Sequence, residues 1–160
     1  AHHLRRGTKC RETPVHFRAL WGLGAFHFVR GDQRNARQVA DQCLAAARQA
    51  NDVDSRMEAH YLSGIVRCAM GEFVPGQRDL DACVRIYGTG RREEHQVLYG
   101  QDPKASALGW IAMARWVCGR PDEALAIAEE ALAFVRDTRQ PFLLARSLAA
   151  VGFVRVRIAR

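Results

Sequence analysis

Apolar residues recur every three or four positions along most of the chain, which is the period of an α-helix that buries one face. The period runs through residues 15–30, 33–50, 54–70, 74–87, 103–118, 121–136 and 141–158. No stretch alternates strictly between apolar and polar residues, as a half-buried β-strand would. The pattern therefore predicts an all-α fold of about seven helices.

The breaks between these segments carry residues that favour helix ends. Gly31, Gly71 and Gly119 each close an apolar stretch, and glycine readily adopts the left-handed conformation in which many helices end. Prolines lie in the first turns of four segments, where a missing N–H costs no hydrogen bond: Pro75, Pro103, Pro121 and Pro141. These signals agree with the periodicity on where the helices begin and end.

Small residues recur at fixed distances from the same three glycines. The positions seven before, five after and twelve after each glycine hold Gly, Ala or Cys, as in Gly24, Ala36 and Cys43 around Gly31. Small residues let antiparallel helices approach closely, and such hairpins stack into solenoids. We therefore expect a flexible segment at 1–14 and a repeat domain over 15–160. Its expected parts are three helix pairs at 15–50, 54–87 and 103–136, a long loop at 88–102, and a single helix at 141–158 that begins a truncated fourth pair.

The turn within each pair resembles that of the tetratricopeptide repeat. The G-x-x-x-x-A pattern of this repeat is matched at Gly31–Ala36 and Gly119–Ala124, and with a second glycine at Gly71–Gly76. The three leading glycines lie 40 and 48 residues apart, whereas the standard repeat has about 34 residues, so the version here is degenerate. The resemblance implies a right-handed solenoid of helix hairpins.

Two longer motifs resemble a more specific group. Leu20-Trp-Gly-Leu-Gly-Ala-Phe-His-Phe-Val-Arg-Gly31 and Leu98-Tyr-Gly-Gln-Asp-Pro103 together resemble the C-terminal repeat region of large bacterial signalling proteins. Those proteins join an adenylate/guanylate cyclase or a DNA-binding output domain to an AAA-type ATPase and then to such repeats, as in ATP-dependent transcriptional regulators. The resemblance implies a regulatory segment of a larger protein. A start at Ala1-His-His without Met fits a fragment or residues left by a tag.

The net charge of +7 leaves a second function class open. A basic surface is typical of proteins that bind nucleic acid, so a nucleic-acid-associated regulatory module is the alternative to a protein-binding scaffold. The basic residues, however, are spread along the chain, and the pair Arg91-Arg92 is followed at once by Glu93-Glu94. We expect an arginine-rich solvated surface, with nucleic acid the less favoured partner.

Catalytic and metal-binding patterns are absent from the sequence. The five cysteines include no C-x-x-C pair, the histidines have no partner at the spacing of a zinc-binding helix, and no G-x-x-x-x-G-K-[ST] phosphate loop occurs. Four cysteines lie in apolar helical segments, which is typical of reduced, buried thiols in a cytoplasmic protein. No run of about 18 apolar residues indicates a membrane span. We expect a cytoplasmic, non-catalytic segment without cofactor, metal or membrane contact.

The first helix of each pair lines the concave face of such a solenoid. This geometry predicts an exposed aromatic and apolar groove, and stripes of this kind normally mark binding surfaces. Its expected residues are Arg18, Trp21, Phe28, Glu58, Tyr61, Ile65, Trp110, Met113 and Trp116. The expected occupant is a protein, a peptide or another domain of the same polypeptide. The alternative is that some of these aromatic residues are core between the repeats.

The connection at 88–102 is too long for a turn within a helix pair, and long loops in compact domains are often functional. We expect Arg91, Arg92, Glu93, Glu94 and His95 to face solvent, with residues 91–94 mobile, and Tyr99 to be buried.

The last predicted helix lacks the second helix of its pair. We expect Leu144, Leu148 and Val151 to pack on the third pair. The opposite face, with Phe153, Val156 and Ile158, would then be uncovered, and solenoid ends need polar caps to stay soluble. We therefore expect homo-oligomers to form through this helix.

Overall fold

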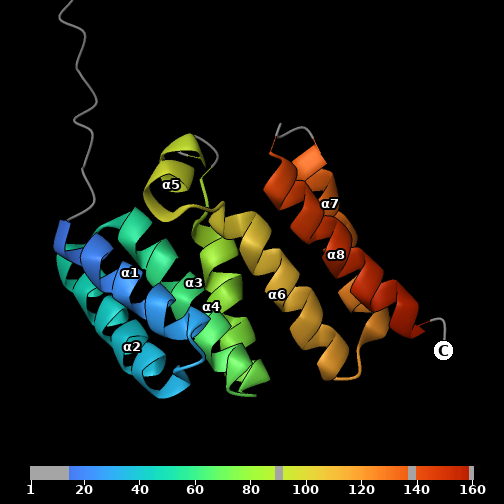
Figure 1. Ribbon diagram of the computed structural model, residues 1–160, viewed down its shortest axis with the longest axis horizontal. Helices are drawn as coiled ribbons and strands as arrows, with labels where there is room; N and C mark the ends of the chain where they lie inside the picture. The colour runs from blue at the N-terminus through green and yellow to red at the C-terminus, as the bar shows by residue number, and fades with distance from the viewer. Residues whose placement is uncertain (1–14, 89–91, 137–139, 159–160) are drawn as a thin grey trace, which may run out of the picture.

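The computed structural model describes residues 15–88, 92–136 and 140–158, with the side chains of all but residues 92–94, 157 and 158. Within these ranges the chain forms eight α-helices and no β-strand (Figure 1). The helices are α1 (Val15–Val29), α2 (Gln33–Ala50), α3 (Val53–Ala69), α4 (Phe73–Ile86), α5 (Arg92–Tyr99), α6 (Pro103–Val117), α7 (Pro121–Arg136) and α8 (Pro141–Ile158). The predicted all-α class is confirmed.

Seven helices agree with the predicted ranges to within one residue at each end, and the eighth, α5, does not. It occupies the stretch for which a long loop is predicted, so that prediction is wrong for residues 92–99. The apolar period is too short to reveal this helix, because the buried side chains within its described residues 95–99, His95 and Tyr99, span a single turn and one of them is polar.

The helix ends follow from their residues. Gly31, Gly71 and Gly119 have φ angles of 77°, 82° and 75°, in the left-handed region where a side chain would be strained. At the opposite ends, Asp52 accepts a hydrogen bond from the backbone N–H of Ser55 at 2.8 Å, and Asp102 accepts one from that of Ala105 at 3.0 Å. These carboxylates satisfy amide groups that the helix itself leaves unpaired.

The small residues mark close approaches between helices in the first part of the chain. A Cβ atom at Gly76 on α4 would lie 2.7 Å from the Sγ atom of Cys68 and 3.0 Å from the carbonyl oxygen of Gly64, both on α3. A Cβ atom at Gly24 on α1 would lie 2.6 Å from a methyl carbon of Leu62 on α3. The side chains that these glycines lack would not fit between the helices.

The helices are arranged as a row with a second layer behind it. Helices α1, α3, α6 and α8 contact one another in that order, while α2, α4 and α7 each pack against the row members that precede and follow them in the chain. Figure 1 shows this succession from blue at α1 to red at α8, with α5 beside the row rather than in it.

The buried core is divided between the two ends of the row. The largest cluster contains residues of the four helices α1, α2, α3 and α4, together with Tyr99 of α5 and part of α6. A smaller cluster around Leu132 and Val151 joins α6, α7 and α8. None of the helices in the described ranges is long and apolar enough to cross a membrane.

Two predictions about burial need correction. Helix α8 packs through Leu143, Val151 and Val154, whereas Leu148, predicted to be buried, is 52% exposed, because the buried face of the helix lies to one side of the one predicted. Of the cysteines predicted to be buried, Cys118 is exposed, because it caps the C-terminal end of α6 rather than lying on its packed face.

Candidate binding groove

The row formed by α1, α3, α6 and α8 is hollowed by a cavity of about 370 Å³. Five of the nine predicted groove residues line this first hollow: Trp21, Phe28, Tyr61, Ile65 and Trp110. The lining also contains Ala25, Val29, Leu62, Tyr99, Gly100, Gln101, Phe142 and Arg146. The structure therefore brings much of the predicted stripe together around one concave surface.

At its N-terminal end this surface is covered, and the prediction of an exposed stripe is wrong there. Trp21, Glu58, Tyr61 and Ile65 are all buried. The Tyr99 ring packs edge-on against the Trp21 ring, with 4.8 Å between centroids, and the Trp21 indole N–H donates to the Glu58 carbonyl oxygen at 3.3 Å. The chain covers Trp21 with its own α5.

Helix α5 is held to α3 by a buried polar cluster. His95, predicted to face solvent, is buried; its Nδ1 lies 2.9 Å from Oε1 of Glu58 and its Nε2 lies 3.5 Å from Oδ1 of Asp54. Burial raises the pKa of Glu58, and the hydrogen bond and charge of His95 act against this rise. The imidazole also stacks on the Tyr99 ring, which is buried as predicted. One histidine thus joins α5 to two acidic residues of α3.

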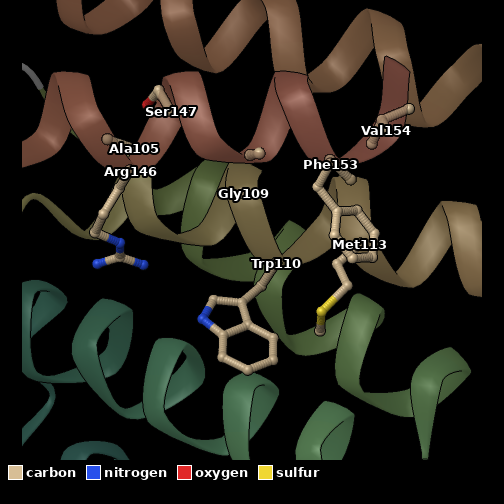
Figure 2. A pocket seen from close by; sticks show the side chains of 10 residues that line it. Ala105, Gly109, Trp110, Met113, Arg146, Ser147, Phe153 and Val154 are labelled. Atoms are coloured by element: carbon tan, nitrogen blue, oxygen red, sulfur yellow. The ribbon is translucent and has the colours of Figure 1, made fainter. Parts of the chain in front are cut away.

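Farther along the row the surface is open. Phe28, Trp110 and Met113 are half-buried, and the Phe28 and Trp110 rings meet edge-on, with centroids 5.9 Å apart. A second hollow of about 260 Å³ lies between α6 and α8. Figure 2 shows Trp110 and Met113 reaching from α6, and Arg146 and Phe153 reaching from α8, into this space. Trp110 and Arg146 line both hollows, so the two adjoin.

Among the residues that the structure describes, Arg146 is the single charged side chain in the lining of either hollow. One of its terminal nitrogens donates to Oγ of Ser106 at 3.2 Å, and the guanidinium lies 5.8 Å from the centre of the Phe142 ring. Burial raises the pKa of Tyr61, while the charge of Arg146 acts in the opposite direction. The open part of the groove therefore combines aromatic walls with one positive charge.

Sequence reasoning missed part of this lining. Arg146, Gln101 and Phe142 do not belong to the predicted stripe, although Arg146 could have been noticed as a charge within the apolar first half of α8. Gln101 and Tyr99 enter the lining because α5 folds back over the row, which no sequence period reveals.

The remaining candidate residues lie elsewhere. Arg18 and Trp116 line neither hollow, and the Trp116 ring packs edge-on against Phe153, with centroids 5.4 Å apart. Phe153 is therefore not left uncovered, whereas Val156 is 60% exposed. Arg91 and the side chains of Arg92, Glu93, Glu94 and Ile158 lie outside the described residues.

One polar cluster on α3 and α4 contains the residue types of a catalytic triad but not its arrangement. Nδ1 of His60 lies 3.0 Å from Oδ1 of Asp79, and Ser63 donates to Oδ2 of Asp79 at 2.8 Å. Both side chains bond to the carboxylate, so the histidine does not activate the serine, as nucleophilic catalysis requires. Burial of Asp79 raises its pKa, but the bonds from His60 and Ser63 outweigh this and lower it. The cluster ties α3 to α4.

In the described part of the chain, no three His, Cys, Asp or Glu side chains are grouped so that they could hold a metal ion. No family model matches the sequence, and a comparison with curated proteins finds no match.

Proposed function

We propose that this chain is a non-catalytic regulatory scaffold of tetratricopeptide-like helix hairpins, which holds an apolar partner in the groove along α1, α3, α6 and α8. The partner is a protein segment, a peptide or a ligand. The observation that carries the proposal is the open aromatic surface around Trp110, where two adjoining hollows meet. Concave, mostly apolar surfaces with a few polar groups are the usual form of binding sites.

The arrangement of helices supports the scaffold class. Successive helix pairs stack in a row, and glycines with left-handed φ angles end the first helix of three pairs. In a larger signalling protein of the kind that the two sequence motifs resemble, such a row reports the occupancy of its groove to neighbouring domains. The buried free thiols of Cys43, Cys68 and Cys83 suit a reducing cytoplasm.

The nucleic-acid alternative is weakened by ion pairing. Several arginines are paired with carboxylates, among them Arg37 with Glu72, Arg67 with Asp79 and Arg155 with Glu129. Such pairs reduce the positive charge that is free to meet phosphates. The aromatic groove is therefore the better basis for a function than the net charge.

The experiment uses Nile red, an uncharged apolar dye, titrated into the whole chain. We expect its emission to rise and shift to the blue as it enters the groove. In Trp110→Ala the affinity should fall by about tenfold, because that ring walls both hollows. Val74→Ala, which trims an exposed apolar side chain on α4, is the matched control and should bind like the wild type. Equal loss in both variants, or none in either, would contradict the proposal.

A further inference from the structure

We propose that the groove binds a small organic acid, whose apolar ring or chain fills the adjoining hollows and whose carboxylate pairs with Arg146. This inference rests on the proposed binding function of the groove, and it names the chemistry of the occupant.

The positive charge of the lining favours an anionic ligand. Arg146 contributes a positive charge to both hollows, and neither lining contains an acidic residue among those whose side chains are described. In the described part of the chain no carboxylate forms an ion pair with Arg146; two of its neighbours are the Ser106 hydroxyl, which accepts from a terminal nitrogen, and the Tyr61 hydroxyl, to which it is also hydrogen-bonded. A guanidinium carries five N–H donors in a fork that matches a carboxylate in shape. The fork is therefore placed, by its bond to Ser106, to receive a carboxylate from the groove.

A second donor in the lining lacks a partner. Gln101 is only 9% exposed, lines the first hollow, and its buried Nε2 atom has no hydrogen-bond partner. A buried donor left unpaired costs free energy, and an acceptor oxygen on a ligand in this hollow would remove that cost. Gln101 and Arg146 thus both favour a ligand group with acceptor oxygens, such as a carboxylate.

The rest of the lining and its size favour a compact apolar body. Apart from these polar groups the first hollow is walled by rings such as Trp21, Phe28 and Trp110. Volumes of about 370 Å³ and about 260 Å³ are together in the range of small-molecule sites, which is roughly 300–1,000 Å³. A stable protein partner would instead need about 800 Å² of surface on each side. The two hollows therefore suit a small molecule better than a folded protein.

Helix α5 also limits the length of the occupant. Tyr99 and Gly100 line the first hollow at the end where α5 covers Trp21. An extended peptide that ran along the whole row would have to displace α5 and break the contact of His95 with Glu58. A short acid that stays beside Trp110 and Arg146 leaves that contact intact.

The test compares two probes of the same shape, 1-naphthaleneacetate and its uncharged amide, 1-naphthaleneacetamide, by calorimetry on the whole chain at neutral pH. We expect the wild type to bind the acid about tenfold more tightly than the amide, because the charged hydrogen bonds are lost with the amide. In Arg146→Met the acid should bind no better than the amide does to the same variant. Arg155→Met, on the same helix and outside both hollows, should keep the preference.

Each other outcome overturns the inference. Equal affinities for acid and amide in the wild type would show that charge plays no part, and a preference that survives in Arg146→Met would place the anion elsewhere. If Nile red binds through Trp110 while neither naphthalene probe binds, the proposal of an organic acid as ligand is wrong, but the proposal that the groove binds apolar partners is retained. If Nile red binding is also independent of Trp110, the groove function itself fails.

Discussion

The two ends of the groove are lined by the same kinds of side chain, yet only one end is covered. At the first, Trp21 and Glu58 lie beneath His95 and Tyr99 of α5. At the second, Trp110 and Met113 remain half-buried beside Arg146. The covered end shows that an apolar concave surface in this fold can be completed by a single short helix. The open end offers a similar surface and, beside it, a charge that suits a ligand.

The largest effect should follow from loosening the cover of the first end. Glu58→Ala removes the fully buried carboxylate that holds His95 and leaves the longer contact to Asp54 as the acidic partner of the imidazole on α3. We expect a loss of about 3 kcal/mol in the free energy of unfolding, from the lost hydrogen bond and the cavity together. Urea denaturation measures it. The control Glu130→Ala removes an exposed carboxylate and should cost less than about 0.5 kcal/mol; equal losses would mean that the cluster does not hold α5.

Helices also approach more closely in the first part of the chain than around the open end of the groove, and Gly76→Ala tests this between α3 and α4. The added methyl group would meet Cys68 and the backbone of Gly64, so we expect a loss of about 2 kcal/mol. At the open end, a Cβ atom on Gly109 of α6 would have no atom within 4 Å, and Gly109→Ala should instead stabilise the protein by about 0.5–1 kcal/mol. Thermal unfolding of both variants distinguishes them, and a loss of stability in Gly109→Ala would show that the open end is packed.

The close approach at Gly76 illustrates what the sequence could predict. The pattern of apolar and small residues predicts seven helices and the fixed positions of Gly24, Gly64 and Gly76, because periodic burial and close packing restrict residue types locally. It does not predict α5, because this eight-residue helix is held through His95 and Tyr99, which lie only one turn apart and so repeat no period. Without α5, the sequence predicts that Trp21 is exposed, and it does not place Gln101 and Arg146 in one lining.

A smaller effect is expected from acid. Hydrogen bonds from His60 and Ser63 lower the pKa of Asp79 despite its burial. A lowered pKa in the folded state means that this carboxylate stabilises the fold above its ordinary pKa of 3.8 and that the stabilisation is lost as the pH falls through the folded value. We expect wild-type stability to drop more steeply below this pH than that of Asp79→Asn. Urea midpoints between about pH 2 and 5 test this, and parallel curves would refute it.

The smallest effect concerns self-association through α8. Because Phe153 packs against Trp116 while Val156 stays exposed, the uncovered apolar area at this end is smaller than the sequence suggests. We expect weak dimers at high concentration, which Val156→Glu weakens by less than about tenfold. Sedimentation equilibrium measures the constant. If the dimers are unaffected by this change, or if the wild type forms no dimers, the protein does not self-associate through this end of α8.

Iodide quenching of single-tryptophan variants tests most directly that one end of the groove is covered and the other open. The first variant keeps Trp21 (Trp110→Phe with Trp116→Phe), and the second keeps Trp110 (Trp21→Phe with Trp116→Phe). Because α5 buries Trp21 and leaves Trp110 half-exposed, iodide should quench Trp110 several-fold more strongly, and Nile red should then protect Trp110 alone. Equal quenching of the two tryptophans, or protection of Trp21 by the dye, would contradict the account.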